Sequence, residues 1–319
     1  MRGGDTMDTT TTIPTINSAP FSAFHAHPGY RRMFAPERLT IGIFLPLRLY
    51  EGDMRVLAGQ VFDPFTYLAF LAARTKKVAL ATGSAIVSLR HPIDLAKASA
   101  TIDQLSGGRL VLGIASGDRP IEFPAYGLEH AARGERFAQA VAYLRQLMPA
   151  GRLSIDSPLG RFAGAEFLPK PATGSIPLIV TSSSGQSLAW VAEHADGWLT
   201  YPDATHTPQR PQRLAGKIRA WREQIPDGGF RPHMTNEWLD LVDDPDHPRI
   251  PLRSGYVLRT GRKGLIALLE EWQAAGVNHA ALGMQFSQRP AAEVIQELAE
   301  DVLPLFPTHQ GPPALSAAW

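Results

Sequence analysis

The chain has 319 residues, which allows one large domain or two of ordinary size. Its 31 lysines and arginines nearly balance its 30 aspartates and glutamates, so the formal net charge of +1 provides no broad basic field for nucleic acid. Cysteine is absent, which excludes disulfides, thiolate metal ligands and a cysteine nucleophile and suits a reducing compartment. No apolar run reaches the ~20 residues of a membrane helix, and residues 1–20 lack the apolar core of a secretory signal. We therefore expect a cytoplasmic enzyme or binding domain without a membrane partner.

Predicted strands and helices alternate after a threonine-rich N-terminal segment. Buried strands are predicted at 39–44, 78–84, 110–115, 177–181, 197–201, 256–258 and 280–284. Helices are predicted at 63–74, 92–106, 137–148, around 188–191, 265–272 and 290–302. Asp63 before Pro64 and the pair Gly107-Gly108 are typical of a helix start and a helix end.

This alternation predicts a parallel sheet covered by helices, closed as an eight-stranded barrel or open as a doubly wound sheet. No G-x-G-x-x-G follows the first strand, which weakens the dinucleotide-binding alternative. The segments 150–176 and 202–252 are rich in Pro, Gly and Asp, and we interpret them as long excursions between barrel elements. Seven strands are predicted, one fewer than a barrel requires.

Three segments of small residues follow predicted strands. Residues 181–187 (TSSSGQS) stand between a strand and a helix, where backbone amides and hydroxyls bind phosphate; a simple cap and turn is the alternative. Residues 81–92 (ATGSAIVSLRHP) allow a flat ring to approach the backbone, or merely fill a crowded interior. In residues 113–118 (GIASGD), Asp118 faces a ligand or forms a surface pair with Arg119.

The histidines do not indicate a metal site. His91 is more typical of a residue that orders a loop than of a general acid or base, and His194 is expected to end a helix. His25, His27 and His247 lack metal-ligand spacing with carboxylates, so no metal is assigned. No G-x-S-x-G is present, so a nucleophile elbow is unsupported.

Residues 90–118 (RHPIDLAKASATIDQLSGGRLVLGIASGD) closely resemble the core motif of luciferase-like flavin monooxygenases. That motif is a helix opened by His-Pro, a D-x-L-S-x-G-R turn and a glycine-bearing strand. Residues 181–201, 276–306 and 40–47 resemble the family's second motif, last βα unit and first strand. The similarity covers residues 39–306, so we expect an N-terminal extension at 1–38 that is partly disordered, a luciferase-like (β/α) TIM-type barrel domain at 39–306 and a C-terminal tail at 307–319.

The resemblance implies an FMN-binding enzyme, commonly a homodimer, that receives reduced flavin from a separate NAD(P)H-dependent reductase and oxidises a small organic substrate with oxygen. Ser182, Ser183 and Gln186 match the family's phosphate contacts, and Thr82 to Ser84 match a strand end that passes the flavin ring, often through a non-proline cis peptide. Ser116 replaces an arginine of the luciferases, so no aldehyde reaction is assigned. The full set implied to bind the cofactor is Thr82, Gly83, Ser84, Ala115, Ser116, Ser182, Ser183, Ser184, Gly185 and Gln186; the catalytic residue is unknown.

One departure from the family lies after Tyr50. The residues between Tyr50 and Asp63 are too few for the helix and strand that family members carry there, so the barrel is expected to lack one helix-strand unit. The missing strand end commonly supplies polar active-site residues. Three functions therefore stay open: an FMN-dependent monooxygenase, a deazaflavin-dependent hydride-transfer enzyme, and a flavin-binding protein without catalysis.

Overall fold

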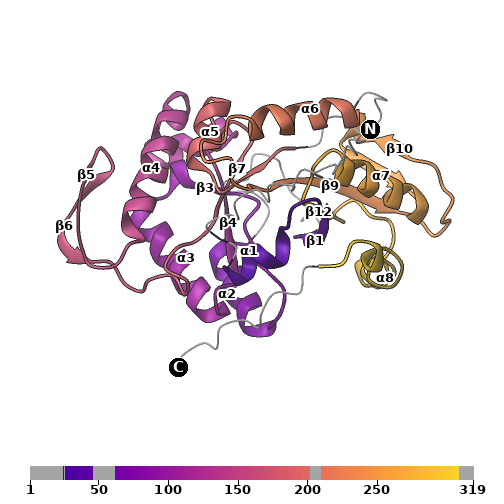
Figure 1. Cartoon of the computed structure of the whole chain (residues 1–319), viewed down its shortest axis with the longest axis horizontal. Coiled ribbons are helices and arrows are strands. Elements are labelled where there is room, and N and C mark those ends of the chain that lie inside the picture. The colour runs from indigo at the N-terminus through magenta and orange to yellow at the C-terminus, as the bar shows by residue number, and fades with distance from the viewer. Residues whose placement is uncertain (1–23, 25, 46–61, 202–209, 309–319) are drawn as a thin grey trace, which may run out of the picture.

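A computed structural model describes residues 24, 26–45, 62–201 and 210–308. The expectations for residues 1–20, for the segment directly after Tyr50 and for the end of the C-terminal tail lie outside these residues. Figure 1 shows a curled, mainly parallel sheet with helices packed around its outer side. The predicted α/β barrel class is confirmed, in the form of a partial barrel.

Seven strand positions form the sheet in the order β1-β12-β9-β8-β7-β4-β2, and every neighbouring pair is parallel. β3 continues the line of β2 and also pairs with β4. Within the described residues β1 pairs only with β12, and β2 only with β4, so the sheet is not hydrogen-bonded shut between β1 and β2. The strands are β1 (Thr40–Phe44), β2 (Leu80–Ala81), β3 (Ala85–Ile86), β4 (Leu110–Ala115), β7 (Leu178–Thr181), β8 (Gly197–Leu199), β9 (His233–Leu241) and β12 (His279–Gly283).

Residues 202–252 were predicted to form a long excursion between barrel elements, and this prediction is wrong for two parts of the segment. Residues Arg210–Arg222 form helix α6, and β9 is a central barrel strand. β9 escaped prediction because polar residues interrupt its apolar positions. The predicted strand at 256–258 is β11 (Val257–Thr260), which pairs with the carboxyl half of β9 and with antiparallel β10 (Ile250–Leu252), beside the main strand order. The count of seven barrel strands therefore stands, with β9 in place of β11.

The predicted helices are present, and their ends follow the predicted signals. Asp63 caps α2 by accepting the N–H of Thr66 at 2.9 Å, and Gly107 ends α3 with a φ of 67°. The helices are α2 (Pro64–Arg74), α3 (Pro92–Ser106), α4 (Arg133–Leu147), α5 (Leu188–His194), α7 (Arg262–Ala274) and α8 (Ala291–Glu297). Shorter 3₁₀ turns cover Val87–Leu89, Pro120–Tyr126, His130–Ala132, Arg253–Gly255 and Leu303–Leu305, and a π turn covers Leu298–Val302. None of the described helices is long and apolar enough to span a bilayer.

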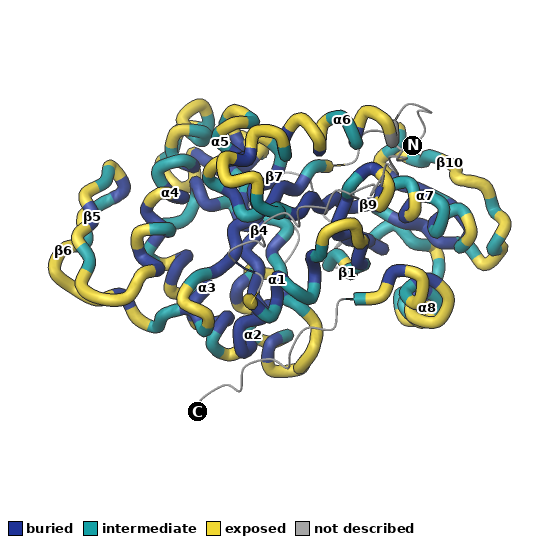
Figure 2. Tube along the Cα trace, in the orientation of Figure 1, coloured by how far each residue is buried: buried dark blue, intermediate teal, exposed yellow. Residues whose placement is uncertain are grey.

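The barrel strands separate two kinds of core. Outward residues such as Leu110 and Leu112 pack under the helices, whereas alternate residues such as Val111 belong to an inner cluster with Ile179, Leu199 and Met234. The central strands β4, β7 and β9 accordingly appear mostly buried in Figure 2. This alternation assigns every other residue of each strand to the inner face.

The amino end of the barrel is filled by residues that precede β1. Helix α1 (Pro28–Met33) packs Tyr30, Met33 and Phe34 into the inner cluster, and Gly29 N–H donates to Gly108 O at 3.0 Å. Burying a side chain of this size contributes about 1.5–3 kcal/mol. Part of the expected N-terminal extension therefore belongs to the packed fold, and the inner space at this end of the strands is occupied by side chains.

The segment 150–176 contains a separate antiparallel hairpin, β5 (Arg152–Ser157) and β6 (Gly160–Glu166). Figure 1 shows it projecting beside α4, away from the sheet. Its tip is fixed to the barrel helices because His91 Nε2 lies 2.8 Å from Leu159 O, and Leu159 packs in the outer core.

Candidate functional site

Three loops meet at the carboxyl ends of β2, β4 and β7. Ser184 Oγ accepts the N–H of Ser116 at 3.3 Å and donates to Thr181 O at 2.8 Å. Ser84 Oγ is hydrogen-bonded to Thr181 Oγ1. The sequence-predicted residues of these three segments, far apart along the chain, are therefore in one region, on the rim where barrels carry their active sites.

The inner wall below this rim is made of residues with little or no side chain. Val111 of β4 belongs to the inner cluster, and side chains alternate between the two faces of a strand, so Gly113 and Ala115 also lie on the inner face. Thr82 Oγ1 donates to Gly113 O at 2.6 Å, and a Cβ on Gly113 would stand 2.0 Å from Thr82 O. Glycine is thus required at 113 for the two strands to approach. The peptide bond between Gly83 and Ser84 is cis, as the resemblance implied.

Phe44 reaches across the unpaired seam between β1 and β2. A Cβ on Gly83 would lie 2.9 Å from the Phe44 ring, so the two residues are in close contact although their strands do not pair. The ring covers the backbone of the β2 end on the side where the sheet stays open. Close to the candidate site, the Phe44 side chain therefore provides a contact between β1 and the end of β2, which are not joined by hydrogen bonds.

The loop from Ser182 to Gln186 is tightly folded. Ser182, Ser184 and Gly185 have φ values of 51°, 48° and 78°, and Gln186 N–H donates to Ser183 O at 2.9 Å. Gln186 Nε2 donates to Gly134 O at 2.7 Å, which ties the loop to the start of α4. Left-handed residues can turn neighbouring N–H groups to one side, a geometry that binds anions. The N–H groups of Ser182, Gly185 and Gln186 already donate within the protein, so those of Ser183 and Ser184 are the candidates. The side chain of Gln186 is engaged in holding this loop.

The other half of the inner wall contains residues that sequence reasoning missed. Met234 belongs to the inner cluster, so Asn236 and Trp238 of β9 also face inward. Asn236 is 4% exposed, and its Oδ1 has no hydrogen-bond partner among the described residues. Tyr201 follows β8; burial, and then the Asp118 carboxylate, raise the pKa of its hydroxyl. The M-N-W alternation of β9 was the available sequence signal.

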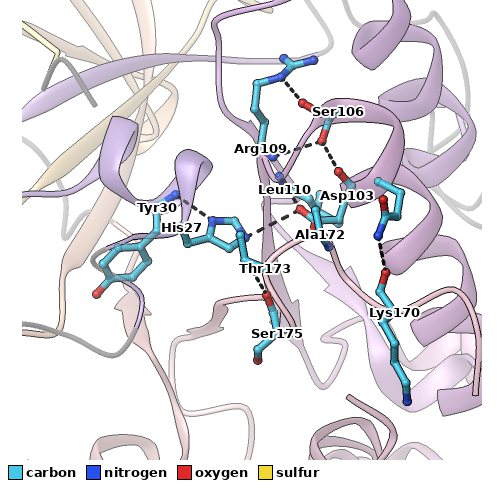
Figure 3. Close-up of polar contacts among 11 residues, drawn as sticks. His27, Tyr30, Asp103, Ser106, Arg109, Leu110, Lys170, Ala172, Thr173 and Ser175 are labelled. Carbon is cyan, nitrogen blue, oxygen red and sulfur yellow. Dashed lines mark hydrogen bonds and ion pairs between the residues drawn. The ribbon is translucent and has the colours of Figure 1, made fainter. Parts of the chain in front are cut away.

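The D-x-L-S-x-G-R turn of the core motif lies at the opposite end of β4. Asp103 accepts the N–H of Leu110 at 3.3 Å and that of Ala172 at 2.8 Å, and His27 Nε2 lies 3.7 Å from Asp103 Oδ1 (Figure 3). Burial raises the pKa of Asp103 to about 6 and lowers that of His27 to about 4. Five residues of strand, about 16 Å, separate Leu110 from Ala115, so this cluster joins elements and does not touch the site.

Arg109 of the same turn is also structural. Its guanidinium donates to the carbonyls of Ala72, Thr75 and Val78 at 2.7–3.2 Å, and its Nε donates to Ser106 O at 2.7 Å. Arg109 therefore donates hydrogen bonds to the unpaired carbonyl groups at the end of α2 and joins that end to the end of α3. The most specific part of the sequence motif encodes packing between helices.

Three of the polar residues singled out in the sequence have structural partners, namely His91, His194 and Arg119. His91 Nδ1 accepts the N–H of Ile93 at 3.2 Å while Nε2 binds Leu159 O, which confirms the loop-ordering interpretation. His194 ends α5 as expected. Arg119 pairs with Glu122 at 2.8 Å, and Asp118 is exposed. The described residues contain no cluster of metal-ligating side chains.

The profile of luciferase-like monooxygenases matches residues 29–229. The chain belongs to the luciferase-like monooxygenase family. The matched range begins within α1 and covers the loops after β2, β4 and β7, whereas Asn236 and Trp238 of β9 lie beyond it.

Relatives of this luciferase-like protein differ in their named activities. An uncharacterised protein of Mycobacterium tuberculosis is 31% identical over 179 residues, which cover 54% of this chain and 64% of that protein. The 5,10-methylenetetrahydromethanopterin reductase of Archaeoglobus fulgidus is 33% identical over 135 residues, 42% of this chain and 40% of the reductase. A pyrimidine monooxygenase of Allorhizobium ampelinum is 29% identical over 157 residues, 48% of this chain and 42% of the enzyme. In each case less than two thirds of the relative is matched.

Solved structures confirm the fold. The monooxygenase RslO1 from Streptomyces bottropensis superposes with a TM-score of 0.68 at 21% identity, covering 84% of this chain and 88% of that one. A coenzyme F420-dependent tetrahydromethanopterin reductase from Methanopyrus kandleri superposes with a TM-score of 0.61 at 16% identity, covering 77% and 88%. The shared barrel thus occurs both in a monooxygenase and in an F420-dependent reductase.

Proposed function

We propose that this protein is a flavin-dependent monooxygenase that binds FMN at the carboxyl ends of β2, β4 and β7. The observation that carries the proposal is the bare inner wall at Gly83, Gly113 and Ala115 next to the folded loop 182–186. A planar ring needs a wall without large side chains. At Gly113 the Thr82 carbonyl stands where a Cβ would be, and Ala115 adds only a methyl group. The N–H groups of Ser183 and Ser184 and the hydroxyls of the loop would bind a phosphate.

The residues of the chain have distinct roles in this proposal. Ser182 and Ser183 would hold the phosphate, Gln186 would keep the loop in place, and the strand end from Thr82 to Ser84 would lie against the ring. Reduced FMN would supply the electrons that activate oxygen. Phe44 and Trp238 would exclude water from the ring, because each closes one side of the wall with an aromatic surface.

A specific observation supports a second candidate. One relative with a named activity, a methylenetetrahydromethanopterin reductase, is 33% identical, and an F420-dependent reductase shares the fold. A deazaflavin would use the same barrel for hydride transfer without oxygen. We keep this alternative, and flavin binding without catalysis as a third, because the described residues include no counterpart of the family's second strand.

Two measurements separate these functions. Fluorescence titration with FMN and with F420 compares the two affinities, and tighter binding of FMN by at least about tenfold supports the oxygenase. Protein loaded with FMNH2 is then mixed with oxygen, and hydrogen peroxide is followed over time. An oxygenase delays peroxide release relative to free FMNH2. Immediate release of one peroxide per flavin would refute oxygenase activity and leave binding alone.

The proposal includes partners that follow from this chemistry. Reduced FMN would come from a separate NAD(P)H-dependent reductase, and the substrate would be a small organic molecule. A homodimer is proposed by analogy with the family. Sedimentation of the purified protein measures its mass directly, and a single species of 34.7 kDa would contradict the dimer.

A further inference from the structure

A second hollow opens at the carboxyl ends of β9 and β12. Its volume is about 320 Å³, and its lining includes Asp240, Arg253, Arg259, Gln285 and Ser287. Leu258 of β11 packs in the outer core, so its neighbours Val257 and Arg259 lie on the inner face. Asp240 pairs with Arg259 in the ladder and lies two residues after the inward Trp238 of β9, so it also faces inward. The hollow therefore lies at the carboxyl edge of the inner face, and β8 separates β9 from β7, which the loop 182–186 follows.

The charges of this hollow do not cancel. Asp240 is 1% exposed, and its Oδ2 accepts from Arg259 at 2.7 Å while its Oδ1 accepts the N–H of Gln288 at 2.9 Å. The Arg253 guanidinium lies 4.6 Å above the Phe286 ring, and within the described residues no carboxylate pairs with it. Two arginines and one aspartate leave a net charge of +1. The aspartate is already neutralised by Arg259, so the positive charge of Arg253 is unopposed.

Neutral polar groups in the same hollow also lack partners. Gln285 Oε1 and Ser287 Oγ are buried and have no hydrogen-bond partner among the described residues. The hydroxyl is a donor, and rotation of the Gln285 amide puts N–H groups at the position of Oε1. Such groups are costly to bury without a partner. Together with the Arg253 guanidinium over the Phe286 ring, they supply a set of donors that line one small hollow.

We propose that this hollow binds an anionic group, a carboxylate or phosphate, of the molecule that the enzyme acts on. Arg253 would pair with the anion through its planar fork, and Ser287 and Gln285 would donate the remaining hydrogen bonds. Arg259 is paired with Asp240, so Arg253 supplies the positive charge that the anion would meet. This inference deepens the proposed function, because it makes the substrate an organic acid or phosphate whose charged end lies under Arg253 while the rest of it reaches the wall at Gly113.

Calorimetric titration with matched probes tests the anion site. Benzoate and phenylphosphonate should bind the wild-type protein, whereas benzamide should not. Arg253→Met should weaken both anions by at least about tenfold, the loss expected for one charge-assisted hydrogen bond, and Arg253→Lys should recover part of it. Arg161→Met is the control, because Arg161 is 77% exposed on the β5–β6 hairpin and its loss changes the net charge equally. Equal binding of benzoate and benzamide, or an unchanged affinity in Arg253→Met, would overturn the proposal.

Two further arms separate the source of the anion and the two proposals. If the anion belongs to the substrate, phenylphosphonate binds protein saturated with FMN, and Arg253→Met leaves FMN affinity unchanged. If it belongs to the cofactor, the probe and the flavin compete, and the proposed substrate class is wrong. A wild-type protein that binds phenylphosphonate but neither flavin refutes the proposed function and retains the anion site. The reverse result refutes the anion site alone.

Discussion

Replacing Gly113 by alanine tests whether the bare wall of β4 matters for both folding and cofactor binding. The new methyl group would stand 2.0 Å from Thr82 O, a backbone atom, whereas ordinary contact is 3.4–4 Å. Either β2 or β4 must therefore shift by more than 1 Å. Overpacking of this kind costs about 1–3 kcal/mol of unfolding free energy. Since Thr82 precedes the cis peptide at Gly83–Ser84, the shift also moves the surface proposed for the flavin ring.

The assay is urea unfolding followed by tryptophan fluorescence, combined with FMN titration. Gly216→Ala is the matched control, because Gly216 lies in α6 with no atom within 4 Å of an added Cβ. The control should be neutral or stabilised by up to about 1 kcal/mol through helix propensity. Gly113→Ala should lose about 1–3 kcal/mol and weaken FMN binding at least about tenfold. Wild-type stability with wild-type affinity would refute the close-approach argument; lost stability with wild-type affinity would refute the ring's location.

Three more predictions follow. Ser183→Asp keeps an acceptor for the Gly185 N–H, 3.3 Å from Ser183 Oγ, but repels a phosphate, so FMN affinity should fall about tenfold; the neutral Ser183→Asn should stay near wild type, and similar losses in both variants would place the phosphate elsewhere. Asp103→Asn removes a carboxyl whose folded pKa is raised from 3.8 to about 6. Because the folded state then binds more protons than the unfolded state, Asp103 costs stability as pH rises, about 1.3 kcal/mol between pH 5 and 7. The wild type should lose that amount relative to the variant over this interval in chemical denaturation, and parallel profiles would contradict the pKa. His91→Leu removes the bond to Leu159 O and should speed proteolysis within residues 152–166, measured by mass spectrometry; an unchanged cleavage rate there would show that other contacts hold the hairpin.

The buried histidines impose the opposite pH dependence. Burial lowers the pKa of His27 to about 4, of His233 to about 3 and of His279 to about 4, so the unfolded state binds more protons below pH 6.5. Stability from these residues is present above pH 6.5 and is lost as pH falls toward 4. Comparing the wild type with Asp103→Asn at each pH isolates the aspartate from this background.

The sequence by itself determined the class of fold and most of its elements. Continuous apolar strands such as 110–115, and caps such as Asp63 and Gly107, act over a few residues, so their pattern is legible without a structure. It also predicted three loops of small residues after strands, because parallel topology brings carboxyl ends to one rim. The structure shows the hydrogen bonds that join these loops, through Ser184 and Thr181.

Tertiary structure alone decided the rest. The polar strand β9 exists because its inner residues face a lumen and its ladder pairs with β8, β11 and β12, which no local pattern reveals. The filling of the amino end by α1, the structural role of Asp103 and the hollow around Arg253 all depend on residues distant in sequence. Burial and pairing of that kind are properties of the packed chain. Because of them, the D-x-L-S-x-G-R turn serves helix packing at the amino end of β4, whereas the candidate site lies at the carboxyl end of the same strand.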